Sequence, residues 1–324
     1  MIYPWQQKQW QQLMRAQKDH RLPHALLFAG QRGTGKTHFA ECFMRAQLCQ
    51  QNNADASCTC HSCRLITGKS HPNILWIAPE KTGGAIKVDQ IREVTDFVNQ
   101  TSLQGEYRFV VINPASNLNI NAANALLKTL EEPASGSILI LITDQISHLP
   151  ATILSRCQHI HFPRPDTELA LTFLTQKLPA GSQPELILRL ANGAPLAALE
   201  WVQQDILAPR EHLLKMIYAL SKNQVDPLKA AAEIQKMETP HIFNFMLSFI
   251  MDLLRLHLSV DEMVNQDFKT ELADLRARTV MQKIAQFQHY LLDLCDQLQK
   301  GINLNKQLML ECMLIRWMEC SVDV

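Results

Sequence analysis

The stretch GQRGTGKT at residues 30–37 constrains the fold of this chain more than any other feature. It follows an apolar run at 25–29 and opens a helix-forming stretch at 37–50, which is the setting of a G-x-x-x-x-G-K-[ST] phosphate loop. Lys36 is expected to reach the terminal phosphates and Thr37 to offer its hydroxyl to Mg²⁺, while a glycine-rich structural turn is the alternative. The predicted phosphate-binding residues are Gly30, Gly33, Thr34, Gly35, Lys36 and Thr37.

Short apolar runs alternate with helix-forming stretches after this loop. Continuous apolar runs of this length, separated by amphipathic helices, predict an α/β domain whose parallel sheet is covered on both faces. The expected strands are 25–29, 74–77, 109–112, 137–142 and 158–162, and the expected helices are 88–98, 121–131 and a short one near Thr152.

Ligands of such sheets bind beyond the carboxyl ends of the strands. Gly30, Asn113, Thr143 and Arg156 are expected at or near such ends. From 166 onward the pattern is helical, after a plausible hinge at Pro163-Arg164-Pro165, because proline disfavours helix in the residue before it. The sequence therefore predicts an α/β domain followed by helical domains.

The composition describes a folded, electrically balanced chain. At 324 residues two or three domains are expected. Lys plus Arg and Asp plus Glu are both 31, so no global basic field draws the chain to DNA by itself. The N-terminus lacks the regions of a signal peptide, and the most apolar stretch, 242–251, is about half the length that a membrane helix needs. We expect a soluble, cytoplasmic protein with no membrane contact.

Four of the nine cysteines lie close together, as C-x8-C-x-C-x2-C. Four thiolates suit tetrahedral Zn²⁺, and a closed ligand set makes the ion structural. Free or redox-active thiols are the alternative, and His61 is a possible substitute for one cysteine. The predicted ligands are Cys49, Cys58, Cys60 and Cys63.

A working P-loop ATPase also needs acidic residues at the end of a neighbouring strand, to hold Mg²⁺ and to orient the attacking water. The run 108–112 ends instead in Asn113-Pro114, a weak metal ligand followed by a residue that cannot accept a proton. Asp144 or Glu131 is the alternative source of an acid, although neither lies at the expected strand end. We therefore do not expect this chain to hydrolyse ATP by itself.

Two further stretches carry a family resemblance. LLKTLEEP at 126–133, followed by Ser-Arg-Cys at 155–157, resembles the clamp-loader branch of the AAA+ ATPases. The resemblance extends over the whole chain, including Pro4-Trp5, the cysteine insertion and His71-Pro72.

The resemblance implies a role for each part of the chain. Arg156 would be an arginine finger directed at the ATP of a neighbouring subunit, and Thr143 would sense the γ-phosphate. The implied domains are an AAA+ P-loop domain at 1–163 with a zinc module at 49–63, a small helical lid at 164–205 and a helical oligomerisation collar at 206–324, which holds five subunits in a ring.

Three departures from the family pattern refine this implied function. Active loader subunits carry an acidic pair where this chain has Asn113-Pro114, and a lid arginine where it reads GAPLA at 193–197. Both losses match a member that assists hydrolysis without performing it. The Cys58-x-Cys60 step is one residue short of the family's usual spacing, which leaves the ligand set open. The intact loop at 30–37 leads us to expect that ATP or ADP, with Mg²⁺, binds and stays.

The function that the resemblance implies is that of a clamp-loader subunit in a bacterial replicative DNA polymerase holoenzyme. Its implied partners are ATPase subunits of the gamma/tau type, a delta subunit and, through the complex, the sliding clamp and primer-template DNA at the nucleoid. This chain would have no polymerase activity and little or no ATPase activity. The alternative is a self-sufficient AAA+ motor of a clamp loader or a branch-migration helicase. A P-loop nucleotide kinase with a zinc-stabilised lid is a third class, but the substrate-facing arginines that it needs are not found.

Overall fold

The computed structural model of the chain describes residues 1–51, 58–81, 83–99, 107–179, 181–260, 262–299, 302 and 304–321. The chain divides into two compact units. The first consists of Met1–Gln176 with Gly193–Ala197, and the second of Lys177–Asn192 with Ala198–Val324.

A parallel sheet is the centre of the first unit. Among the described residues, five strands pair in the order β2-β3-β4-β1-β5, and every pairing is parallel. This confirms the predicted sheet. The strands are β1 (Ala25–Ala29), β2 (Ile74–Ile77), β3 (Arg108–Ile112), β4 (Ser137–Thr143) and β5 (Gln158–His161).

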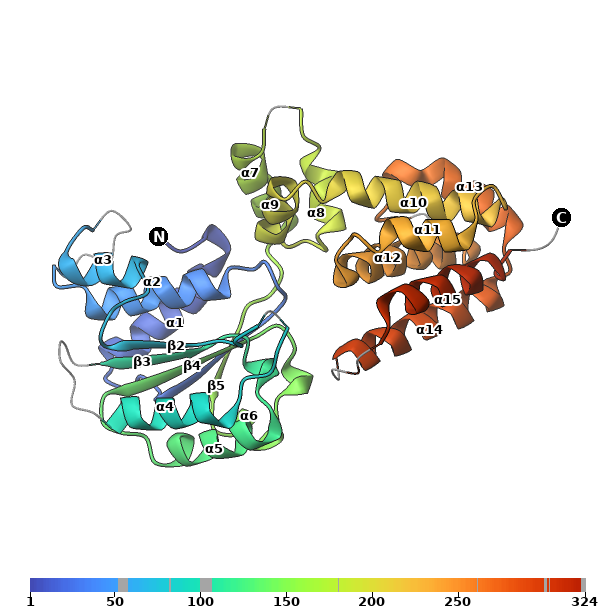
Figure 1. Ribbon diagram of the computed structural model, residues 1–324. Helices are drawn as coiled ribbons and strands as arrows, with labels where there is room; N and C mark the ends of the chain where they lie inside the picture. Colours follow the sequence, from blue (N-terminus) through green and yellow to red (C-terminus); the bar gives the residue numbers. More distant parts are fainter. Residues whose placement is uncertain are drawn as a thin grey trace. The chain divides into compact units, whose positions relative to one another are not determined.

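Helices cover both faces of this sheet, as expected for strands that are apolar along their whole length (Figure 1). Leu26 and Phe28 of β1 pack on one side, and Leu27 packs on the other. The first face is covered by α1 (Gln7–Lys18), α2 (Lys36–Leu48) and α3 (His61–Thr67), and the second by α4 (Val88–Asn99), α5 (Ile120–Glu131) and α6 (Ala151–Leu154).

Two helices of this unit were not predicted. Helix α1 reads QKQWQQLMRAQK, so most of its residues are polar, and its buried positions are Gln9 and Leu13. Helix α3 lies inside the cysteine insertion and begins at a cysteine cap. The other predicted helices and strands of the sheet domain agree with the structure to within two residues at each end.

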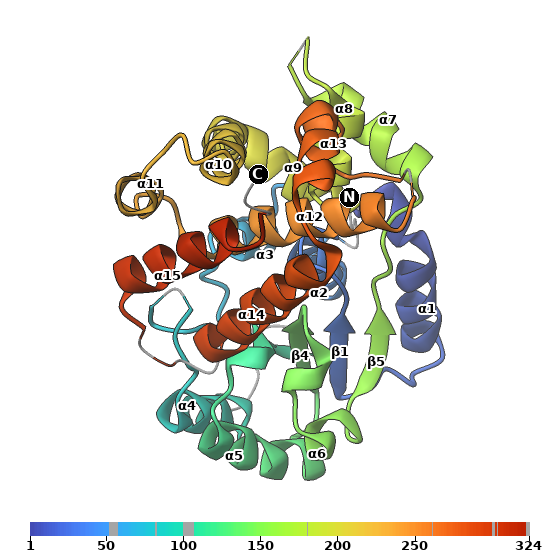
Figure 2. The same ribbon diagram turned by 90° about the vertical axis from the view of Figure 1, so that its right-hand side faces the viewer.

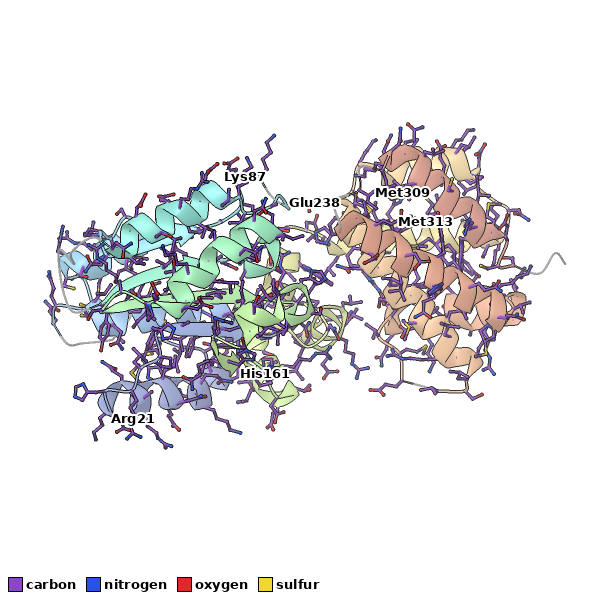
Figure 3. The ribbon with its side chains drawn as sticks, turned by 90° about the horizontal axis from the view of Figure 1, so that it is seen from below. Arg21, Lys87, His161, Glu238, Met309 and Met313 are labelled. Atoms are coloured by element: carbon purple, nitrogen blue, oxygen red, sulfur yellow. The ribbon has the colours of Figure 1, made fainter. Side chains whose placement is uncertain are left out.

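The second unit is helical. Its core surrounds α12 (Thr239–His257), which packs against α10 (Leu207–Ser221), α13 (Lys269–Arg278) and α14 (Met281–Gln299) and buries residues on several sides. The indole N–H of Trp317, fully buried on α15 (Lys306–Met318), donates to the Ile217 carbonyl at 2.8 Å. Met309 and Met313, also on α15 and buried, are labelled in Figure 3. The helices after β5 are α7 (Thr167–Lys177), α8 (Pro184–Leu190), α9 (Pro195–Gln203), α10 (Leu207–Ser221), α11 (Pro227–Ile234), α12, α13 (Lys269–Arg278), α14 (Met281–Gln299) and α15 (Lys306–Met318).

Helix α12 contains the most apolar stretch of the sequence, 242–251, and most of the residues in this stretch are buried. Its buried residues include Asp252, whose carboxylate accepts hydrogen bonds from the backbone N–H groups of Val264 and Asn265. Among the described residues, no helix is both long enough and apolar enough to cross a bilayer.

Candidate functional site

The loop at 30–37 connects the carboxyl end of β1 to α2, as the sequence predicts. Gly33 and Gly35 have φ values of 82° and 88°, in the left-handed region that side chains disfavour, and Gly35 is the N-cap residue of α2. Backbone of this shape at a helix N-terminus suits an anion, because the helix adds partial positive charge there.

Lys36 is the buried cation of this loop. Its ammonium donates to the carbonyls of Gly30 and Gln31, at 2.6 and 2.9 Å, and to Oδ1 of Asp144 at 2.6 Å. The Lys36 side chain is 4% exposed, whereas that of Asp144 is 43% exposed. Burial lowers the pKa of Lys36, and the nearby Asp144 carboxylate opposes this effect. The ammonium therefore lies in an environment that favours an anionic partner.

The N-terminal segment holds the loop from outside. The 3-10 turn η1 (Pro4–Gln6) places Trp5 and Gln6 so that both side-chain N–H groups donate to the Thr34 carbonyl, at 3.0 and 2.9 Å. The hydroxyl of Thr34, which is fully buried, donates to the Gln31 carbonyl at 2.9 Å. Side-chain contacts of Thr34 are thus made within the loop.

The loop also packs against residues 193–197. The Leu196 N–H donates to the Gly33 carbonyl at 3.2 Å. A Cβ added to Gly33 would lie 2.6 Å from the Cβ of Ala197 and 3.1 Å from that of Ala194. Small apolar side chains therefore occupy the position next to the loop.

The carboxyl end of β3 supplies an amide to the site. Asn113 follows Ile112 directly, and its Nδ2 donates to the hydroxyl of Thr37 at 3.1 Å. The Thr37 hydroxyl, the predicted Mg²⁺ ligand, is therefore contacted by a neutral group from the strand end where an ATPase carries its acidic pair. Asn113 cannot act as a general base.

The carboxyl end of β4 brings Thr143 and Asp144 to the same edge. The Thr143 hydroxyl donates to the Gln145 carbonyl at 3.0 Å and accepts from the Gln145 N–H at 3.1 Å. The Thr143 hydroxyl is therefore hydrogen-bonded within the turn at 143–145. Asp144, which the sequence offered only as an alternative acid, reaches Lys36 directly. The signal for this contact was its position immediately after a buried strand.

Arg156 does not lie at the carboxyl edge of the sheet, and that expectation was wrong. It precedes β5, so it belongs to the amino edge, on the side toward which α6 lies in Figure 2 while the arrowheads of β1, β4 and β5 point the other way. Its guanidinium donates to Oε1 of Glu131 at 2.5 Å and to the Thr152 carbonyl at 3.0 Å. The Arg156 side chain is 35% exposed. Glu131, at the end of α5, is therefore remote from the phosphate loop and is not the missing acid.

The four predicted cysteines come together. The sulfurs of Cys49, Cys58, Cys60 and Cys63 all lie within 4.8 Å of one another, and none of the four is in a disulfide. Tetrahedral zinc with Zn–S bonds of about 2.3 Å places its sulfurs about 3.8 Å apart. The Cys49–Cys58 and Cys49–Cys60 sulfur distances are 3.5 and 4.0 Å, so the cluster could hold such an ion. Among the described residues, His61 is not part of this group.

The cysteine insertion is built around Cys60, the N-cap residue of α3. The Cys63 N–H donates to the Cys60 sulfur at 3.5 Å, and this hydrogen bond is the main cause that lowers the pKa of Cys60 to about 6. Burial raises the pKa of Cys63 instead. A metal ion would favour the thiolate form at both positions.

His71 joins this insertion to the sheet. The Asn73 N–H donates to its Nδ1 at 3.1 Å, so Nε2 carries the proton and donates to the Ser62 hydroxyl at 2.8 Å. Burial lowers the pKa of His71, which favours this neutral form. The His71-Pro72 motif thus ties α3 to the start of β2.

Comparison with known proteins places the chain in a family. The model of "DNA polymerase III, delta subunit" matches residues 5–166, and that of "DNA polymerase III, delta subunit, C terminal" matches residues 204–319. The DNA polymerase III subunit delta' of Pseudomonas aeruginosa is 34% identical over 98% of this chain and 97% of its own length, and that of Escherichia coli is 32% identical over 97% and 94%. The chain belongs to the delta-prime family of DNA polymerase III subunits.

The chain is also similar to a DNA polymerase III subunit of another kind. The DNA polymerase III subunit tau of Bacillus subtilis is 32% identical over 75% of this chain and 47% of its own length. The resemblance to clamp-loader subunits drawn from the motifs is therefore confirmed at the level of the family. The geometry of this delta-prime family member adds three features that the motifs did not predict: the Lys36–Asp144 pair, the Glu131–Arg156 pair and the Trp5–Thr34 contact.

Proposed function

We propose that this member of the delta-prime family is a clamp-loader subunit that serves the ATP site of a neighbour rather than its own. It assembles with ATPase subunits of the gamma/tau type and a delta subunit, supplies Arg156 in trans, and helps load the sliding clamp onto primed DNA at the bacterial nucleoid. It has little or no ATPase activity of its own.

The observation that carries this proposal is that the phosphate loop and Arg156 belong to opposite edges of one sheet. β1 and β5 pair in parallel from Leu26 with Gln158 to Ala29 with His161. Gly30 follows the carboxyl end of β1, whereas Arg156 precedes the amino end of β5. A five-residue strand rises roughly 16 Å, which is longer than an arginine side chain. The Arg156 side chain, about one third of which is exposed, is thus available to another subunit and out of reach of its own loop.

The loss of hydrolysis is supported by the end of β3. Asn113 contacts Thr37 at the position where catalysis needs a carboxylate, and Pro114 follows it. The residues at 193–197 that pack on Gly33 include no lid arginine. Nucleotide bound here would therefore be held without being cleaved.

The proposal includes a bound metal ion and a bound nucleotide. Cys49, Cys58, Cys60 and Cys63 would hold a structural Zn²⁺, which cross-links a polar insertion that has little core of its own. Gly30, Gly33, Thr34, Gly35, Lys36 and Thr37 would hold ATP or ADP with Mg²⁺, with Thr143 nearby.

The domain division is also a proposal. We assign 1–163 to the P-loop domain with its zinc module at 49–63, 164–205 to the lid and 206–324 to the collar. The long buried helices of the second unit, with α12 at their centre, support the collar assignment.

Arg156→Ala in the reconstituted loader complex tests the finger. We expect the complex to assemble normally and the neighbour's site to lose roughly 10³- to 10⁵-fold in turnover, the range measured for fingers supplied in trans. The measurement is DNA-stimulated ATP turnover. Arg92→Ala is the matched control, because Arg92 also forms a surface ion pair, with Asp89. Turnover equal to that of the control would exclude the finger.

Asp144 is the observation that favours the alternative, a self-sufficient ATPase, because it places a carboxylate at the loop. That carboxylate is engaged with Lys36, so it is poorly placed to activate water. Steady ATP turnover by the purified chain, abolished by Lys36→Ala, would establish the alternative and overturn the proposal.

A further inference from the structure

The contact between Lys36 and Asp144 places a carboxylate of the chain itself next to the phosphate loop. In phosphate loops this lysine reaches the β- and γ-phosphates of the nucleotide. Here Oδ1 of Asp144 lies 2.6 Å from the ammonium, the distance of a strong charge-assisted hydrogen bond. The carboxylate is therefore one of the three acceptors of the Lys36 ammonium, and a terminal phosphate oxygen that approached Lys36 would compete with it.

Asp144 is held in this position by its neighbours in the chain. Thr143 before it and Gln145 after it are joined by two hydrogen bonds through the Thr143 hydroxyl. The Gly30 N–H donates to the Thr143 carbonyl at 3.3 Å, which fixes the turn to the start of the loop. The carboxylate is thus positioned by backbone on both sides and by the loop itself.

A fixed carboxylate at this place affects di- and triphosphates differently. A nucleoside diphosphate leaves the γ-position free, so Asp144 can remain on Lys36 while the loop holds the β-phosphate. A triphosphate brings further negative charge against the carboxylate. It must either displace Asp144 from Lys36 or accept the repulsion between like charges.

We propose that Asp144 acts as a built-in substitute for the terminal phosphate and makes this loop a site for a nucleoside diphosphate in preference to a triphosphate. This inference rests on the proposed nucleotide site and names its ligand class and its specificity-determining residue. The subunit would then keep a diphosphate bound, as a part of its structure, while neighbours bind and cleave the triphosphate.

Isothermal titration of the purified full-length chain with Mg-ADP and with a non-hydrolysable Mg-ATP analogue tests the inference. The variants are Asp144→Asn, which keeps the shape and removes the charge, and Lys36→Ala. Asp89→Asn is the matched control, since Asp89 is also paired with a cation but lies on α4, which covers the other face of the sheet from α2.

We expect the wild-type chain to bind Mg-ADP more tightly than the triphosphate analogue by on the order of tenfold, a size intermediate between exposed and buried charge effects. Asp144→Asn should remove most of this preference, chiefly by strengthening triphosphate binding, and Asp89→Asn should leave it unchanged. Added salt should narrow the wild-type preference, because it screens the repulsion at a half-exposed carboxylate.

The contrary outcomes are distinct. If the wild type and Asp144→Asn prefer Mg-ADP over the triphosphate analogue to the same extent, the role of Asp144 is overturned and the nucleotide site stays intact. No binding of either nucleotide by either protein would overturn the nucleotide site and this inference with it, without touching the role of Arg156. Loss of all binding in Asp144→Asn, with the fold intact by circular dichroism, would make Asp144 a ligand-holding residue and also overturn the inference.

Discussion

Two separate constraints favour glycine at position 33: the conformation of its backbone and the closeness of its neighbours. Its φ of 82° disfavours any side chain, and the Cβ of Ala197 lies only 2.6 Å from the position that an added Cβ would take. Gly83 has a similar φ of 75°, but nothing lies within 4 Å of an added Cβ. The two positions therefore separate the effect of backbone strain from that of packing.

Gly33→Ala should lower the free energy of unfolding more than Gly83→Ala does. Both variants pay about 1 kcal/mol for left-handed backbone. Only Gly33→Ala must also push the chain at 193–197 away, which should add about 1–3 kcal/mol. Chemical denaturation followed by far-ultraviolet circular dichroism measures the difference. Equal destabilisation of the two variants would contradict the close packing at Gly33.

Helix α3, in the cysteine insertion, is attached to the rest of the fold by different contacts at its two ends. Cys60 caps α3, and His71 links the same helix to β2 through Ser62. One end thus depends on the sulfur cluster and the other on hydrogen bonds that need no metal. We infer that loss of metal loosens the insertion around the sulfurs while α3 stays attached to the sheet.

Cys60→Ser combined with Cys63→Ser should release the metal, because oxygen ligands replace two of four thiolates. We expect about one zinc per chain in the wild type and almost none in the double variant, by elemental analysis of the purified protein. Cys312→Ser, at an exposed thiol elsewhere in the chain, is the control. Zinc retained in the double variant at the level of the control would refute the ligand assignment.

At the scale of the whole molecule, the proposed roles are separated between the two edges of the sheet. The loop edge carries Lys36 and its anion, and the opposite edge carries Arg156 with Glu131. A substitution that disables the residues at one edge should therefore leave the proposed role of the other edge intact.

Lys36→Ala should abolish nucleotide binding by this chain and yet leave DNA-stimulated turnover of the reconstituted complex within about twofold of the wild type. The physical reason is that Arg156, the proposed finger, lies at the opposite edge of the sheet from the loop, so its action should not depend on whether the loop is occupied. Titration of the purified variant and turnover of the complex are measured on the same preparation. A fall in turnover as large as that of Arg156→Ala would show that the two edges are coupled.

The sequence was sufficient for the features that depend on local pattern. The apolar runs predicted the five strands, the glycine spacing predicted the loop, and the cysteine spacing predicted the cluster. Helix α1 was missed because it is mostly polar and few of its residues are buried. The pairs Lys36–Asp144 and Glu131–Arg156 join residues 108 and 25 positions apart, and no local pattern encodes such contacts.

The indole of Trp5 stacks on Tyr3, with ring centroids 4.9 Å apart, and its N–H ends on a carbonyl inside the phosphate loop. Any event that shifts this loop must also alter the surroundings of that chromophore. Trp317, by contrast, is sealed within the helical unit. Trp5, one of five tryptophans in the chain, is thus a native optical reporter beside the phosphate loop, and it needs no attached dye.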